Sequence, residues 1–163
     1  MKWGTYLLGL LALLLLGIQL VPNELPEVHI YNSGDLIQSG LVSEDVAALL
    51  KTACYDCHSN ETHFPWYAKV APSSWLVAKD VKEGRESLNF SHWEDLNLMQ
   101  QLGKLDDIAI EVDEGRMPMD IYVKMHREAK LTDAQRRLIV AWAEDTMDRL
   151  VEASEAYEDE EEY

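Results

Sequence analysis

Two cysteines and a histidine stand together in the sequence Cys54-Tyr55-Asp56-Cys57-His58. Two thiols at this spacing can each form a thioether with one of the two vinyl groups of a haem, and the histidine that follows is then held under the iron as an axial ligand. Covalent attachment also keeps the cofactor in a small domain with a limited core. Because the chain has only these two cysteines, the pattern predicts one covalently attached haem c.

Three other interpretations of the cysteines compete with haem attachment. A dithiol redox pair uses the same C-x-x-C spacing, but it is expected in a βαβ context that this sequence lacks. A disulfide across two intervening residues is strained, and it leaves His58 unexplained. A zinc site would combine both thiols with two histidines, drawn from His58, His63, His92 and His126. Haem attachment is favoured over these three because it explains the whole pentapeptide.

A methionine beside a proline is the best candidate for the second axial ligand. Gly115 is expected to end one helix, and Pro118 prevents Met117 from entering the next helix, so Met117 is expected in an extended loop. A thioether in such a bend can point at the iron from the face opposite His58. Met119, His126, His92 and an open coordination position remain as alternatives to Met117.

The elements that must position these residues are predicted to be helices. Ser43 is a suitable N-cap, and the apolar residues that follow it recur at the spacing of one buried helical face. A capping box also predicts a helix start at Thr132-x-x-Gln135. No alternating strand pattern occurs, so the fold class is all-α. Two further helices are predicted between these, one from after Pro72 to Gly84 and one from the capping box Ser91-x-x-Glu94 to Gly115.

The N-terminus predicts export and a membrane anchor. Residues 3–21 carry no charge and are mostly apolar, which is close to the length needed to cross a bilayer. An uncleaved anchor is favoured over a cleaved signal because no small-residue cleavage site follows the apolar run. The positive-inside rule keeps Lys2 in the cytoplasm. The rest of the chain is then expected on the periplasmic side of the inner membrane, held by this single helix.

Charge and composition divide the chain into four parts and exclude one class of partner. We expect an anchor over 1–21, a linker over 22–42, the haem-binding domain over 43–151 and a disordered acidic tail over 152–163. The chain has 30 acidic and 14 basic residues and a net charge of −16. This balance argues against nucleic-acid binding. It favours redox partner proteins with a basic docking surface.

A longer string of motifs resembles the haem-binding domain family of bacterial exported proteins, which is related in arrangement to c-type cytochromes. The resemblance covers roughly residues 50–143. It implies one covalent haem on Cys54 and Cys57, with His58 as the proximal ligand and Met117 as the candidate distal ligand. The motifs that carry it are C-x-x-C-H-S-N at 54–60, P-W-Y at 65–67, A-P-S-S-W at 71–75, L-N-F-S-x-W at 88–93 and G-x-M-P at 115–118.

The pair of axial ligands decides which function is expected. His/Met coordination raises the reduction potential and fills both axial positions, which favours electron transfer. The first hypothesis is therefore a membrane-tethered monohaem cytochrome with a cytochrome c-like helical fold, an electron carrier rather than an enzyme. A haem-based sensor or a peroxidase-like protein is the alternative, since an open sixth position would admit a diatomic gas or peroxide. A non-redox interaction module with a structural metal is the third hypothesis.

Overall fold

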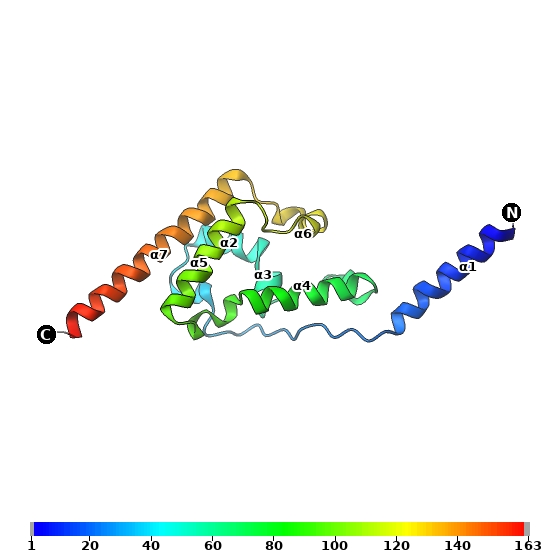
Figure 1. Ribbon diagram of the computed structural model, residues 1–163, viewed down its shortest axis with the longest axis horizontal. Helices are drawn as coiled ribbons and strands as arrows, with labels where there is room; N and C mark the ends of the chain where they lie inside the picture. The colour runs from blue at the N-terminus through cyan, green and yellow to red at the C-terminus, as the bar shows by residue number, and fades with distance from the viewer. Residues whose placement is uncertain (1, 162–163) are drawn as a thin grey trace.

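The computed structural model describes residues 2–161, and within that range every regular element is helical (Figure 1). This confirms the predicted all-α class. The α-helices are α1 (Lys2–Gly17), α2 (Glu44–Ala53), α3 (Tyr55–His58), α4 (Ser73–Ser87), α5 (Leu98–Asp113), α6 (Asp120–Met125) and α7 (Asp133–Glu161). The 3-10 helices are η1 (Ile18–Leu20), η2 (Leu36–Ser39), η3 (Trp66–Lys69), η4 (Phe90–Asp95) and η5 (Arg127–Ala129).

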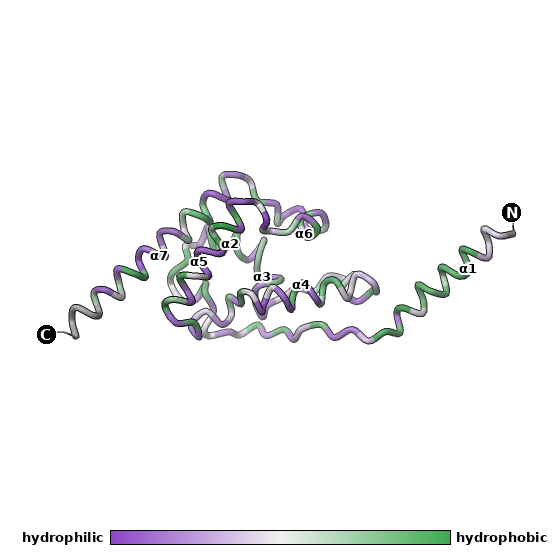
Figure 2. Tube along the Cα trace, viewed as in Figure 1, coloured by the Kyte–Doolittle hydropathy of each residue, from purple (hydrophilic) through white to green (hydrophobic). Residues whose placement is uncertain are grey.

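The N-terminal helix stands apart from the rest of the molecule. Together α1 and η1 include one stretch, Trp3–Leu20, that is long and apolar enough to cross a membrane, and none of it is buried inside the protein. In Figure 2 the leucine-rich part of α1 is coloured as hydrophobic. A row of leucines has no favourable reason to remain in water, so the helix needs an apolar environment that the domain itself does not supply.

The domain core is organised by α5 and α7, which lie antiparallel against each other (Figure 1). α2 packs on α7, and α3 packs on α4. The apolar spacing seen in the sequence is the buried face of these helices: Leu105, Ile108 and Val112 of α5 are buried, as are Val46 and Leu50 of α2. The haem-motif residues therefore lie where the α2–α3 segment meets α4.

Three of the four predicted helix starts are confirmed and one is wrong. The Ser43 hydroxyl accepts a hydrogen bond from the backbone N–H of Val46, and Thr132 forms its capping box with Gln135. α4 begins at Ser73, directly after Pro72 as predicted. The third helix begins later than predicted, because the capping box of α5 is formed by Asn97 and Gln100.

Ser91, which was predicted as the start of that helix, lies in η4, and its side chain connects two loops by hydrogen bonds. Its hydroxyl accepts a hydrogen bond from the backbone N–H of Asn60 and lies 3.4 Å from Asp35 Oδ2. The sequence pattern did not distinguish a serine that caps a helix from one that joins two loops.

The segment expected as a linker, 22–42, is in part a component of the domain. Leu36 is fully buried in the core, and the Leu41 carbonyl accepts a hydrogen bond from Trp142 Nε1 at 2.9 Å. Earlier in the segment, the backbone N–H of His29 donates to the Asn60 carbonyl at 2.8 Å. The boundary at residue 43 is therefore wrong: residues from about Asp35 onward belong to the folded domain.

The acidic C-terminal segment also differs from expectation. The sequence predicted a disordered tail over 152–163, whereas α7 continues through Glu161. Residues 162–163 lie outside the described part of the chain. Glutamate and alanine are strong helix formers, and no Gly or Pro interrupts the helix after Asp133, so α7 has no local reason to stop at the domain boundary.

Candidate functional site

A break between two helices presents the cysteine–histidine motif. α2 ends at Ala53, and Cys54 departs from helical geometry with φ −126° before α3 begins at Tyr55. The Cys54 carbonyl then accepts hydrogen bonds from the backbone N–H groups of Cys57 and His58 at 3.1 and 2.9 Å. This tight turn holds the two thiols and the imidazole on one short stretch of backbone.

The orientation of His58 is set by α4. Its Nδ1 atom lies 3.0 Å from the Gly84 carbonyl oxygen and 3.2 Å from the Leu88 carbonyl oxygen. Both partners are acceptors, so Nδ1 carries the proton and Nε2 keeps its lone pair. Burial lowers the pKa of His58, which also favours the neutral ring. A neutral imidazole with its second nitrogen held by carbonyls is the usual form of a metal-ligating histidine.

Gly84 is the residue that allows this contact. A Cβ atom at this position would lie 2.6 Å from the carbonyl oxygen of Cys57 and 3.1 Å from its Cβ atom. Any side chain there would therefore push α4 away from the motif. The sequence reading that Gly84 ends its helix is wrong, because α4 continues to Ser87. The glycine is needed for a close approach of two segments, which no local pattern in the sequence reveals.

Both cysteines are free, half-buried thiols. Burial, with a smaller contribution from Cys57, raises the pKa of Cys54 to about 12. Burial and the nearby carboxylates of Asp56 and Asp80 raise the pKa of Cys57 to about 11. A redox-active dithiol needs a lowered pKa to provide a nucleophilic thiolate. The surroundings of these cysteines therefore argue against the dithiol alternative.

The motif opens onto a crevice formed by two adjoining cavities of about 320 and 180 Å³. Cys54, His58, Met117 and Pro118 line both of them. The larger cavity has an apolar back wall made by Leu50, Phe90, Ile108 and Val112. The structure thus brings the predicted proximal and distal ligands to one crevice, although they come from segments far apart in the sequence.

The loop that carries Met117 is fixed at both of its backbone groups. The Met117 N–H donates to the Glu111 carbonyl at 3.0 Å, and the Met117 carbonyl accepts from Arg136 Nη1 at 2.9 Å. The same nitrogen of Arg136 donates to the Val112 carbonyl at the end of α5. Gly115, at φ 73°, supplies the left-handed turn between helix and loop. Arg136 is a positioning residue that the sequence analysis did not identify.

The competing ligands lie in different surroundings. Met119 lines the smaller cavity of the crevice and stays a candidate beside Met117. His126 shares a hydrogen bond with the Tyr67 hydroxyl, and His92 pairs with Asp95 on the surface. The His63 side chain is 93% exposed. Among the described residues, no group of three or more His, Cys, Asp and Glu is placed to hold a metal ion, so the set required for the zinc alternative is not assembled.

The residues of the crevice fit a covalently held haem. They provide two thiols on adjacent turns, a histidine with a free Nε2 atom, a methionine across the cavity and apolar walls that a porphyrin requires. Phe90 packs edge-on against His58, with 6.2 Å between ring centroids, and so limits rotation of the imidazole.

Replacing Gly84 tests the close approach of α4. Gly84→Ala is expected to lower the free energy of unfolding by roughly 1–3 kcal/mol, because the new methyl group overlaps the Cys57 carbonyl. Gly103→Ala is the matched control, since a Cβ atom at that position of α5 meets nothing within 4 Å. It should stabilise the helix by about 0.5–1 kcal/mol. Urea unfolding of both variants measures the difference, and equal stabilities would contradict the assigned role of Gly84.

Comparison with known families agrees with this arrangement. The model of the haem-binding domain family matches residues 13–145, which include α2–α6, the crevice and the start of α7. No curated protein and no solved structure matches the chain. Since the family match covers most of the sequence and the crevice supplies the side chains that a haem needs, the chain belongs to the haem-binding domain family.

Proposed function

We propose that the protein is a membrane-tethered, exported monohaem c-type cytochrome that transfers single electrons. Cys54 and Cys57 would carry the haem through thioethers, His58 would be the proximal ligand and Met117 the distal ligand. The observation that carries the proposal is the shared crevice of these four residues, with Nδ1 of His58 engaged by two carbonyls and Nε2 left for iron.

The bound haem would supply an iron that alternates between ferric and ferrous states. The chain's own residues hold both proposed ligands in place while the oxidation state of the iron changes. His58 is held by backbone oxygens of α4, and Met117 is held through its backbone by Arg136, so neither ligand needs to move when the charge on the iron changes. Small rearrangement between the two states is what a fast electron carrier requires.

Membrane tethering is proposed from α1 and η1. The span Trp3–Leu20 meets the length and hydropathy that a bilayer requires, and Lys2 precedes it. By the positive-inside rule Lys2 remains cytoplasmic, which places the haem domain on the periplasmic side of the inner membrane.

A basic redox partner is proposed from the acids around the crevice. Asp107 and Glu111 line the larger cavity, and Asp80 and Glu83 line the smaller one. Within the described part of the chain, no Lys or Arg lines either cavity. The entire chain carries a net charge of −16, so its field would attract a cationic protein over distances longer than contact.

Covalent attachment has a direct test in the two thiols. The full-length protein, expressed with a cytochrome c maturation system, is expected to keep its haem through a denaturing gel and to give a c-type pyridine haemochrome spectrum. Replacing both Cys54 and Cys57 by Ala should abolish in-gel haem staining, because no thioether can then form. A wild-type protein that loses its haem on denaturation would overturn the c-type assignment.

The sixth ligand is tested by Met117→Ala. We expect loss of the methionine–iron charge-transfer band, a shift to high-spin ferric haem and new binding of imidazole or cyanide. Met99→Ala is the matched control, because Met99 lies on α5 with 75% of its surface exposed. Met119→Ala should leave the spectrum unchanged. A wild-type spectrum that is already high-spin would favour the sensor or peroxidase alternative, and an unchanged Met117→Ala spectrum would exclude Met117 as ligand.

The acidic rim predicts a salt-dependent reaction rate. The pair Glu83→Gln and Asp107→Asn is expected to slow electron exchange with a basic cytochrome severalfold at low ionic strength, because it removes two charges beside the crevice. The effect should vanish at 1 M salt, where screening acts within about 3 Å. Asp148→Asn with Glu152→Gln removes the same charge from exposed sites on α7. Stopped-flow rates that fall equally for both pairs would assign steering to net charge alone.

A further inference from the structure

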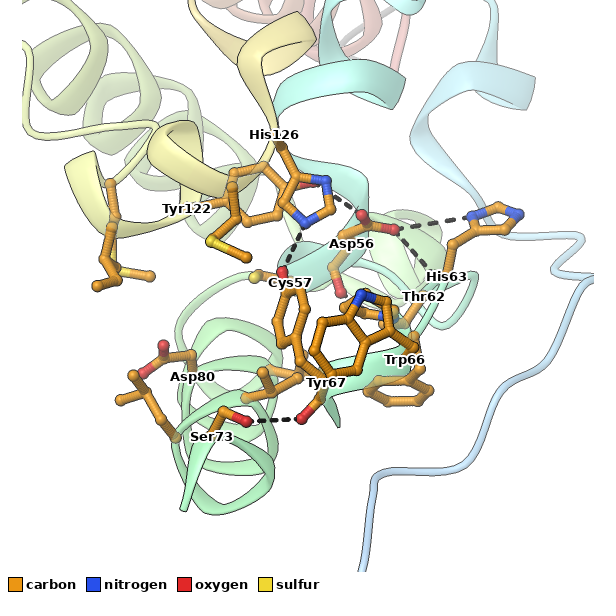
Figure 3. A pocket seen from close by; sticks show the side chains of 18 residues that line it. Asp56, Cys57, Thr62, His63, Trp66, Tyr67, Ser73, Asp80, Tyr122 and His126 are labelled. Carbon is orange, nitrogen blue, oxygen red and sulfur yellow. Dashed lines mark hydrogen bonds and ion pairs between the residues drawn. The ribbon is translucent and has the colours of Figure 1, made fainter. Parts of the chain in front are cut away.

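A second apolar pocket lies beside the crevice and has no part in the proposed electron transfer. It has a volume of about 290 Å³ and lies between η3 and α4 on one side and α6 on the other (Figure 3). Its walls are formed mainly by apolar side chains, among them Phe64, Pro65, Trp66, Leu76, Val77 and Ile121. A pocket of this composition favours an apolar ligand of small-molecule size.

The pocket lies at the end of the domain where the membrane helix is attached. Gln19, in η1, makes two hydrogen bonds of 3.0 Å with the backbone of Ala71, one as donor and one as acceptor. Asn23 Nδ2 donates to the Ser74 carbonyl at 3.0 Å. Ala71 lies between Tyr67 and Ser73, which both line the pocket. The end of the proposed membrane span therefore contacts the segment between η3 and α4 that carries part of the pocket lining.

Exposed apolar side chains surround the pocket on this side. Trp66 is 76% exposed, and Leu76, Ile121 and Met125 are 45, 53 and 58% exposed. Large apolar side chains are seldom left together in water, and beside a membrane span they are compatible with lipid contact. They give the rim of the pocket an apolar surface that an apolar molecule can contact.

Polar groups occupy the inner wall of the pocket. Tyr67 Oη lies 2.8 Å from His126 Nε2, and His126 Nδ1 lies 3.4 Å from Glu128 at the surface. The His126 ring stacks on Tyr122, with 4.3 Å between centroids, and Tyr122 donates to Asp56 at 2.7 Å. These groups give the pocket a polar edge. A simple hydrocarbon chain makes no use of this edge, whereas a ring hydroxyl can form a further hydrogen bond with the Tyr67 oxygen.

The pocket also adjoins the residue that would carry one edge of the haem. Cys57, Met119 and Tyr122 line both this pocket and the smaller cavity of the crevice. A flat ring in the pocket would therefore lie next to the haem edge at Cys57. The binding itself needs no haem, but its position beside Cys57 rests on the proposed function.

We propose that this pocket binds the head group of a membrane quinol, a hydroxylated aromatic ring with a long apolar tail. The ring would lie against Tyr122 and Val77, with a hydroxyl at the Tyr67–His126 pair, and the tail would leave past Trp66 and Ile121 toward the bilayer. The apolar walls select the ring and the tail, and the hydrogen-bonded pair distinguishes a quinol from an ordinary lipid chain.

Binding is tested with two ligands of matched shape, decylhydroquinone and decylbenzene, titrated calorimetrically into the full-length haem-loaded protein in detergent. The wild type should bind decylhydroquinone at least tenfold more tightly than decylbenzene. Leu76→Asp should weaken both by tenfold or more, because it places a charge in the apolar wall. Met99→Asp introduces the same charge at an exposed apolar site of α5 and should change neither affinity.

A second variant isolates the polar pair. Tyr67→Phe combined with His126→Phe should reduce decylhydroquinone affinity to that of decylbenzene, with decylbenzene binding retained. Equal affinity of the wild type for the two ligands would indicate a lipid-chain cavity and overturn the proposal, as would unchanged binding in Leu76→Asp. Because none of these titrations measures electron transfer, they can fail while the haem spectrum and its Met117 dependence remain as proposed, and the reverse also holds.

Discussion

The contact between α4 and the end of α3 is the constraint on which the site depends. One backbone approach, permitted by the missing side chain of Gly84, lets the Gly84 carbonyl of α4 and the Leu88 carbonyl just after α4 hold His58 Nδ1. That contact fixes the tautomer and directs Nε2 into the crevice. It also covers one side of Cys57, against which Gly84 packs. Arg85, the next residue, donates to the Ser59 carbonyl and to Thr62, so the same turn of α4 also holds the loop that follows the motif.

The wall of the crevice opposite His58 is formed by a loop rather than by a helix. Met117 lies in a loop with no regular structure of its own, and its position comes from hydrogen bonds to neighbouring helices. Arg136 reaches from α7 to the carbonyls of Val112 and Met117, and thereby links the last turn of α5 to the loop. The proposed distal ligand is therefore positioned by α5 and α7, the main helix pair of the core. The proposed proximal ligand, His58, is held against α4. The width of the crevice therefore depends on how α4 packs relative to the α5–α7 pair.

The sequence predicted correctly those features that depend only on residues close together in the chain. Ser43 and Thr132 cap helices because their side chains satisfy N–H groups within three residues, and the motif 54–58 is a contiguous pattern. The failures involve distant partners. Gly84 resembled a helix end because its need for space arises only against Cys57, and Ser91 resembled a cap although it joins two loops. Leu36 looked like part of a linker, since the pair Leu36-Ile37 between polar residues is too short to show a periodicity, although Leu36 is fully buried. The family resemblance was confirmed over a longer stretch than the motifs alone had suggested.

The way the N-terminal helix joins the domain has consequences for the whole molecule. A flexible tether would let the domain turn freely, but Gln19, near the end of the apolar span, and Asn23, just after it, bond to Ala71 and Ser74. Further along, the Glu27 carbonyl accepts from Arg85. The chain is thus held against the η3–α4 region at several points, so with the span in a membrane, as proposed, the domain would keep one orientation relative to it. In that orientation the η3–α4 corner would face the bilayer. The acidic crevice extends along α4 away from this corner, as far as Ser87, and a protein partner could therefore approach it from the aqueous side.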